Sequence, residues 1–272
     1  MNLFTPKASI RVATLADIHY GKRTATYNTD ICERRLLTTW ADELSNFREK
    51  NTQLHLFLLG DVNDGSMIFA GQEHHQALLD VREQAKRCAQ LLAKLTERLR
   101  QDYESITWHC VPGNHGRTSK FAAEAANWDI QTYDTLSLLV QLQATLHCTV
   151  DAYDAERIAD HIFLRRVRLY THNYALHHGH TIHSYQTIPW YGILQRALRW
   201  HSAEPFKLLC LGHFHGSGLE PFNGFEMMRT GSPMDGDDWA LETLGVKGDK
   251  HGWTFAVSER EALLYPTRIA LG

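Results

Sequence analysis

Short apolar runs alternate with helical patterns along the first half of the chain, and this alternation constrains the fold more than any other feature. Residues 11–16, 54–59 and 106–111 are apolar runs of strand length. Between them, residues 31–50 repeat apolar side chains at spacings of three and four, and residues 73–100 form a long amphipathic pattern. Strand, helix, strand, helix, strand predicts a mostly parallel sheet with helices packed on its faces.

Polar side chains cluster where the predicted strands stop. Later strands are predicted at residues 207–211, 253–257 and 262–265, and the first of these runs into a polar loop, as the three earlier strands do. In open α/β sheets, ligands bind at the carboxyl ends of strands, so we expect these four loops to converge. Unpaired buried charge is costly, and a divalent metal centre would satisfy such a set. The loops carry Asp17 and His19, Asp61 and Asp64, Asn114 and His115, and His213 and His215.

The composition is that of a soluble globular protein with much histidine. Of 272 residues, 43% are apolar and 22% charged, and the net charge of −3 disfavours bulk attraction to nucleic acid or anionic lipid. Seventeen histidines strengthen the case for metal or acid–base chemistry. Five cysteines lie far apart without a C-x-x-C pair, so reduced thiols are expected. No apolar run has the length of a signal peptide core or a membrane span, so we expect a cytoplasmic protein without a membrane partner.

The ordered clusters resemble the motifs of the calcineurin-like metallophosphoesterases. That family shows D-x-H, G-D-x-x-D, G-N-H, a lone histidine after a strand, and G-H-x-H. The resemblance implies a four-layer α/β/β/α sandwich with two metal ions at the strand ends, and we expect one domain over residues 1–272. The matching residues are Asp17 and His19, Gly60-Asp61 with Asp64, Gly113-Asn114-His115, and Gly212-His213 with His215.

The fourth motif of the family requires a choice among several histidines in the segment YTHNYALHHGHTIHS. The ligand is expected where a strand gives way to a loop, and the family's usual form is a histidine followed by a small residue. His178 lies directly before Gly179 and fits best. In an extended segment His177 would point to the opposite face and His180 to the same face. We therefore predict His178 as the ligand, with His180 as the alternative.

The resemblance and the donor chemistry together imply how two ions would be held. A carboxylate can offer one oxygen to each ion, so Asp61 would bridge them. Nitrogen and oxygen donors without thiolate suit manganese, the leading expectation, and also iron, zinc or nickel. Two such ions can activate a water and stabilise both the attacking and the leaving oxygen of a phosphoester. The other ligands would be Asp17, His19 and His215 for one ion, and Asn114, His178 and His213 for the other.

Two residues of the third loop are predicted to act on the substrate itself. His115 would face the leaving oxygen as a general acid, or stabilise its charge. Arg117 could pair with phosphate through its planar guanidinium, although an arginine on a solvated loop is an equally good interpretation. Both residues follow the strand at residues 106–111 within a few positions.

The substrate class rests on what surrounds the motifs. Protein phosphatases of the family usually show Arg-Gly after the second motif and an acidic residue after G-N-H, whereas this chain has Asp64-Gly65-Ser66 and Gly116. The segments IPWYG and GSPMDGDDWA look more like nuclease-type members and those found in phages and prophages. We therefore expect a DNA phosphodiesterase or nuclease. A phosphodiesterase or phosphatase acting on a nucleotide or other small phosphoester is the alternative, and a non-catalytic scaffold ranks last.

Two further features bear on a nucleic-acid substrate. In LRRVRL, Arg166 and Arg168 would lie on one strand face and Arg165 on the other, an arrangement that could track a phosphate backbone or simply be an exposed charged strand. Trp190 and Tyr191, together with Trp239, could stack bases or belong to the core.

Overall fold

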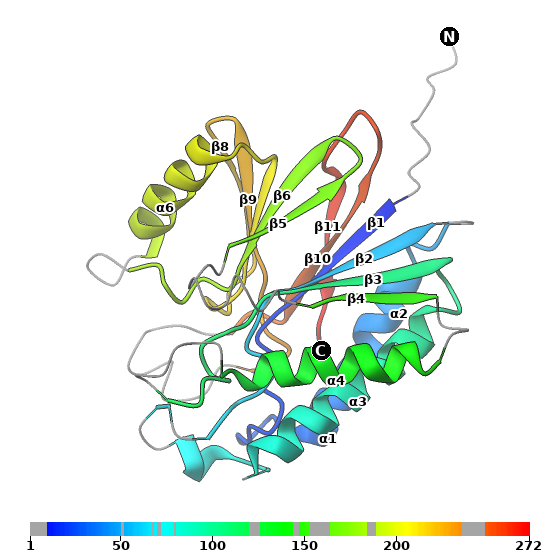
Figure 1. Ribbon diagram of the computed structural model, residues 1–272, viewed down its shortest axis with the longest axis vertical. Helices are drawn as coiled ribbons and strands as arrows, with labels where there is room; N and C mark the ends of the chain where they lie inside the picture. Colours follow the sequence, from blue (N-terminus) through cyan, green and yellow to red (C-terminus); the bar gives the residue numbers. More distant parts are fainter. Residues whose placement is uncertain are drawn as a thin grey trace.

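Two β-sheets pack face to face, and helices cover the outer face of each (Figure 1). The computed structural model describes residues 10–49, 52–66, 68–69, 72–78, 80–119, 126–143, 147–152, 164–183, 189–235 and 248–272. Three apolar clusters fill the spaces between four layers: one between the first sheet and its helices, one between the sheets, and one between the second sheet and its helix. The predicted α/β/β/α sandwich is therefore confirmed.

The first sheet contains six strands in the order β11-β10-β1-β2-β3-β4. Strands β1 to β4 are parallel, while β10 and β11 run antiparallel at one edge. Every residue of β1 is buried, as expected for a strand covered on both faces. The strands are β1 (Ile10–Leu15), β2 (Gln53–Leu58), β3 (Ser105–Cys110), β4 (Cys148–Asp151), β10 (His251–Val257) and β11 (Leu264–Ala270).

The second sheet contains five strands in the order β5-β6-β7-β9-β8. Its three central strands are parallel, and β5 and β8 are antiparallel edges. Helix α6 (Pro189–Ala203) covers its outer face (Figure 1). The strands are β5 (Arg165–Leu169), β6 (His172–His177), β7 (Leu208–Leu211), β8 (Gly218–Phe222) and β9 (Phe225–Arg229).

The first predicted helix is present but irregular. It consists of α1 (Thr29–Arg34), a π-helical segment (Arg35–Trp40) and α2 (Ala41–Ser45), so it ends before residue 50. Asn28 caps its start by accepting from the backbone N–H of Ile31. The π segment begins at Arg35, whose guanidinium donates to the Pro233 carbonyl and pairs with Asp235.

The second predicted helix begins later than residue 73. Helix α3 (Val81–Leu99) starts after Asp80, whose carboxylate caps it by accepting from the backbone N–H of Arg82. Residues Gln72–His75 form a separate 3₁₀ turn instead. The amides of Gln72 and Gln76 donate to backbone carbonyls of the preceding loop, and these contacts hold the segment apart from α3.

The last predicted strand is also displaced. It was expected at residues 262–265, whereas β11 spans Leu264–Ala270. Ser258 shapes a turn before it, because its hydroxyl accepts from the backbone N–H groups of Arg260 and Glu261.

None of the five cysteines is in a disulfide, and four of them are buried. Within the described part of the chain, no helix is long and apolar enough to cross a membrane. Helix α4 (Trp128–Gln141) packs beside α3 on the outer face of the first sheet (Figure 1).

Candidate metal centre

The polar loops that follow β1, β2, β3, β6 and β7 meet between the carboxyl ends of the two sheets. The backbone N–H of Asp17 donates to the Gly60 carbonyl at 3.0 Å, and the N–H of His213 donates to the Asp17 carboxylate at 2.9 Å. Gly113 fits so closely that a β-carbon there would lie 2.1 Å from the Asp61 carboxylate. Residues far apart in sequence therefore form one cluster, as the strand ends predicted. We call this set the strand-end cluster: Asp17, His19, Asp61, Asp64, Asn114, His115, His178, His213 and His215.

One group of possible metal donors consists of Asp17, His19 and His215. The Nε2 atoms of His19 and His215 lie 3.1 Å apart, and His215 Nε2 lies 3.4 Å from an Asp17 oxygen. Asp17 and His19 are fully buried, whereas the His215 side chain is 22% exposed. Three donor atoms converge on one point that is open on the side of His215.

A second group consists of Asp61, His178 and His213, with Asn114 beside it. His178 Nε2 lies 3.0 Å from an Asp61 oxygen and 2.9 Å from the amide oxygen of Asn114. His178 Nδ1 lies 2.7 Å from the Leu59 carbonyl and donates its hydrogen there. That bond directs the other ring nitrogen toward the two oxygens, which is the orientation a metal-binding imidazole requires.

The choice between His178 and His180 has a geometric answer. His178 is fully buried and belongs to the second donor group. His180 is partly exposed and stacks on the ring of His177, with 5.8 Å between ring centroids. The described residues place His178, and not His180, among the converging donors.

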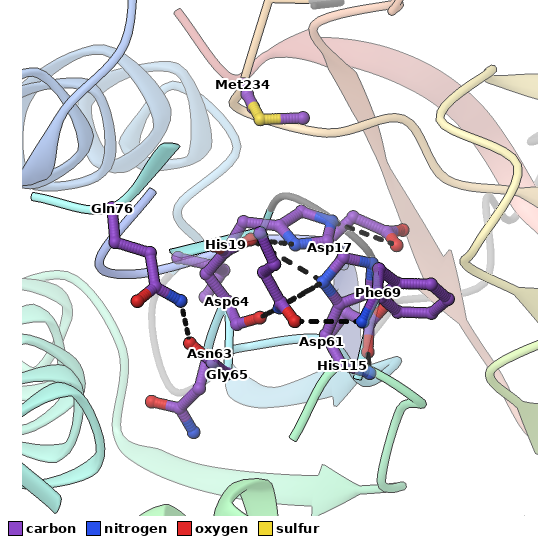
Figure 2. Close-up of polar contacts among 12 residues, drawn as sticks. Asp17, His19, Asp61, Asn63, Asp64, Gly65, Phe69, Gln76, His115 and Met234 are labelled. Atoms are coloured by element: carbon purple, nitrogen blue, oxygen red, sulfur yellow. Dashed lines mark hydrogen bonds and ion pairs between the residues drawn. The ribbon is translucent and has the colours of Figure 1, made fainter. Parts of the chain in front are cut away.

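A third group consists of His19, Asp64 and His115 (Figure 2). One Asp64 oxygen lies 3.4 Å from His19 Nδ1 and 3.5 Å from His115 Nδ1. The backbone N–H of His115 also donates to Asp61 at 2.7 Å. The sequence pattern includes Asp64 but gives it no partner, and the fold places it between the two imidazoles.

The protonation states of the cluster suit metal binding. Burial alone would raise the pKa of Asp17 and Asp61, but nearby imidazoles, chiefly His215 and His178 respectively, hold both values below the usual range. Burial lowers the pKa of His19 to about 4 and that of His213 to about 3. Ionised carboxylates and neutral imidazoles are the forms that bind metal ions.

His178 shows most directly that the cluster requires added positive charge. Burial opposes its protonation, but Asp61 raises the pKa of His178 to about 9. Because Nδ1 donates to Leu59, Nε2 is left facing two oxygen acceptors, and only a proton or a metal ion can bridge them. The residues present therefore fit a divalent cation.

The backbone of the cluster is strained. Asp17, His19, Asp61, His213 and His215 all have positive φ, between 47° and 70°, a region that favours glycine. They make up five of the eight non-glycine residues with positive φ in the described chain. Such conformations persist where surrounding structure imposes them, and they gather at functional sites.

Asp129 is a supporting residue that the sequence analysis missed. It is fully buried in the first turn of α4, and its oxygens accept from the backbone N–H groups of Gly113 and Asn63 at 2.9 and 3.2 Å. Burial and the charge of Asp61 raise the pKa of Asp129 to about 6. The carboxylate ties the second loop to the third and fixes the positions of Asp61 and Asn114.

Arg117 lies beside the cluster and contacts its own loop. Its Nε donates to the Asn114 carbonyl at 2.9 Å. This bond fixes the turn that carries Asn114 and His115, and phosphate binding by Arg117 stays a prediction.

The arginines of β5 do not form the proposed phosphate track. Arg165 is buried and donates to the Cys110 carbonyl at 2.8 Å, while Arg166 pairs with Glu204 at 3.1 Å and lies over the ring of Phe206. Only Arg168 is exposed. The phosphate-track interpretation was therefore wrong for the buried Arg165, while Arg166 is engaged with Glu204.

The aromatic residues predicted as candidates for base stacking differ in their surroundings. Trp190 packs against the core of the second sheet with Arg229 over its ring at 4.5 Å, which supports the structural interpretation. Tyr191 is 65% exposed on α6. Trp239 lies outside the described residues.

Several solved structures are similar to the whole chain at low identity. An archaeal phosphodiesterase is 10% identical, with a TM-score of 0.46, over 96% of this chain and 99% of that chain. Vps29 of Entamoeba histolytica, complexed with zinc, is 12% identical with a TM-score of 0.38 over the same shares of the two chains. A predicted phosphoesterase from Streptococcus pneumoniae TIGR4 is 11% identical, with a TM-score of 0.36, over 96% and 97%.

None of the curated proteins matches the chain. The family model of the calcineurin-like phosphoesterases, in contrast, matches residues 10–229. This span runs from β1 to β9 and includes every residue of the strand-end cluster. The chain belongs to the calcineurin-like phosphoesterase family.

Proposed function

We propose that this protein is a phosphodiesterase that uses two divalent metal ions, with a nucleic-acid type of phosphodiester as its leading substrate. Family membership supports a metal-dependent phosphoesterase. The observation that carries the proposal further is the pair of donor groups built on Asp17 and Asp61. One group contains His19 and His215, and the other contains His178 and His213 with Asn114 beside them.

The proposed ligands are those of the sequence prediction. Asp17, His19 and His215 would hold one ion, Asn114, His178 and His213 the other, and Asp61 both. Bound divalent ions supply Lewis acidity and lower the pKa of water, which is the chemistry that phosphoester hydrolysis requires. Manganese remains the leading expectation, and iron, zinc and nickel suit the same donors.

His115 has the surroundings of a general acid. Burial alone would lower the pKa of His115, but the carboxylates of Asp61 and Asp64 raise it above its usual value. These carboxylates favour the protonated form of the imidazole, and one Asp64 oxygen lies 3.5 Å from His115 Nδ1, where it can orient the ring. The side chain is 20% exposed, so a leaving oxygen can reach it. We propose that His115 protonates the leaving alkoxide.

A small nucleotide diester is the second candidate substrate. The basic residues of β5 were the feature in favour of a long nucleic-acid substrate. Arg165 and Arg166 instead bind partners within the protein, which weakens that support. The net charge of −3 points the same way. A scaffold role ranks last because the donor set is complete.

The test begins with protein freed of metal by a chelator. Adding manganese should restore hydrolysis of a chromogenic phosphodiester, and full turnover without metal would refute the proposal. Replacing His178 by Ala should remove bound metal and activity, whereas His180→Ala is the matched control and should keep both, because only His178 belongs to a donor group.

The salt dependence of the cleavage rate distinguishes the two candidate substrates. Cleavage of long DNA should fall steeply as salt concentration rises, because each phosphate contact releases counterions on binding. Cleavage of a dinucleotide should change little. Activity on dinucleotides with none on DNA would identify the small-diester enzyme.

A further inference from the structure

Phe69 lies on the open side of the strand-end cluster. Its ring centroid lies 4.5 Å from that of His115, with the planes tilted by 37°. The residue is 38% exposed, so more than a third of its surface is open to solvent. Figure 2 shows the Phe69 ring beside His115, at the edge of the polar group formed by Asp61, Asp64 and His19.

The backbone of Phe69 is held in this position by an amide. Gln72 Oε1 accepts from the N–H groups of Ile68 and Phe69 at 3.0 and 3.2 Å. The Nε2 of the same side chain donates to the carbonyl of Asp64. Gln72 is buried, so one side chain fixes the aromatic residue to the loop that carries Asp64.

Exposure defines which side of the cluster a substrate can reach. Asp17, His19, Asp61 and His178 have at most 2% of their surface exposed. His115 and His215 are open, with side chains 20% and 22% exposed. Phe69 stands next to His115 on this open side, where a leaving group protonated by His115 would lie.

We propose that Phe69 binds the flat ring of the leaving nucleoside by stacking on its base. The inference rests on the proposed function, which places the leaving oxygen at His115. Every nucleobase has a face that can stack on an aromatic side chain, and such stacking tolerates changes of sequence. Phe69 is thus a specificity residue that selects diesters whose leaving alcohol carries a base.

A purely structural role for Phe69 gives a different expectation. If the ring only shields His115 from water, its removal alters the proton donor and slows all alkyl diesters alike. If the ring stacks on a base, its removal slows only substrates whose leaving group has that base.

The test compares a thymidine dinucleotide with two analogues in which one nucleoside lacks its base. The leaving alkoxide is chemically the same in all three, so the reaction at phosphorus is matched. We expect wild type to prefer the complete dinucleotide over the analogue with a baseless leaving nucleoside by roughly 5- to 100-fold in kcat/KM. The analogue lacking the other base should be cleaved like the complete dinucleotide.

Variants of Phe69 then decide the inference. In Phe69→Leu the preference should fall to about one, and in Phe69→Trp it should be retained. The control is Tyr265→Leu, which removes an exposed aromatic residue from β11 and should leave the preference unchanged. An unchanged preference in Phe69→Leu, or equal losses on all three substrates, overturns the inference while the proposed function stands.

A binding measurement covers the case in which metal-loaded wild type hydrolyses no phosphodiester, so that the proposed function fails. Dissociation constants are measured for thymidine monophosphate and for deoxyribose phosphate, which lacks the base. Tighter binding of the nucleotide that is lost in Phe69→Leu upholds a base-stacking site without catalysis. Equal affinities for the two ligands, or a preference that survives Phe69→Leu, overturn it.

Discussion

The molecule contains two clusters of histidine and aspartate, and their contrast shows what distinguishes a candidate metal site from a polar core. The histidine row (His55, His109, Asp151 and Arg165) lies on β2, β3 and β4 and reaches across to β5. His109 Nδ1 donates to Asp151 at 3.0 Å, so its Nε2 can accept from His55 Nδ1 at 2.9 Å. Arg165 completes the row by pairing with Asp151.

In the histidine row, the facing ring nitrogens and the carboxylate pair as donor and acceptor, so His55, His109 and Asp151 form a chain of hydrogen bonds that needs no added charge. In the strand-end cluster, His178 Nε2 faces two oxygens while its other nitrogen is already committed to Leu59. The row lies on regular strands, whereas five residues of the cluster have positive φ. A requirement for added charge on a strained backbone, and not the presence of histidine, indicates the metal centre.

The largest effect is expected from substitution of Asp61, the proposed bridging carboxylate, and it tests whether the strand-end cluster holds metal. Asp61→Asn should lower activity on the order of 10³-fold or more and reduce the content of both metal ions, because a neutral amide cannot bridge two cations. Asp17→Asn should mainly lower the content of one ion. Elemental analysis and kcat/KM measure both. Equal metal content in wild type and Asp61→Asn would contradict the bridging role.

The second effect concerns His115 and its leaving group. His115→Ala should keep both metals and much of the activity on a nitrophenyl diester, because nitrophenolate leaves without a proton. On an alkyl diester, kcat/KM should fall by roughly 10²- to 10⁴-fold, the usual contribution of general acid catalysis. Loss of metal in this variant would instead make His115 a ligand, as its group with His19 and Asp64 allows.

The third prediction tests whether the histidine row is structural. Asp151→Asn weakens the partner of buried Arg165 and His109, so the free energy of unfolding should fall by about 1–3 kcal/mol. Metal content and kcat should match wild type. Denaturant unfolding gives the first quantity, and Glu204→Gln is the control because Glu204 is an exposed partner of Arg166. A loss of metal in Asp151→Asn would break the contrast between the two regions.

The smallest effect is a pH dependence of the row. Burial and the neighbouring His109 lower the pKa of His55 to about 3, so the folded protein keeps it neutral while the unfolded chain takes up a proton below about pH 6.5. Stability should therefore fall as the pH drops from 6.5 toward 3. Replacing His55 by Gln should reduce the loss between pH 7 and pH 5 by up to about 2 kcal/mol. Unfolding curves at the two pH values measure this loss of stability, and His74→Gln, at an exposed histidine, serves as the control. If His55→Gln lost as much stability as wild type between the two pH values, His55 would not be the group responsible.

Helices and strands with a regular apolar pattern were predictable from the sequence. Those whose buried face also contains polar residues were not. Strands β1, β2 and β3 are mainly apolar, and each lies within one residue of its predicted position. Helix α4 was missed because it buries Asp129 and Thr132 along with Tyr133 and Leu136, which interrupts the apolar period. The start of α3 was wrong because its cap, Asp80, lies inside a pattern that appears helical on both sides.

The sequence predicted that the loops of the strand-end cluster converge, but not which side chains contact one another there. Strand order brings Asp17, Asp61 and Asn114 to one edge, and this follows from a parallel sheet. The partners of Asp64 and Phe69 depend on how the segment between β2 and α3 folds back through Gln72, which no local pattern encodes. Asp129 likewise acts across 66 positions on Asn63.

The left-handed backbone of five proposed ligands has a consequence for how such a protein changes over generations. A non-glycine residue in that region carries a strain of about 1 kcal/mol or more, and each of the five proposed ligand positions lies there. A folded domain is stable by only about 5–15 kcal/mol, so this strain is a large fraction of the total. Mutation to glycine at His213 or His215 would relax the backbone while removing a proposed ligand. Once selection for catalysis ends, drift should therefore favour a more stable and inactive descendant, marked by glycine at the former ligand positions.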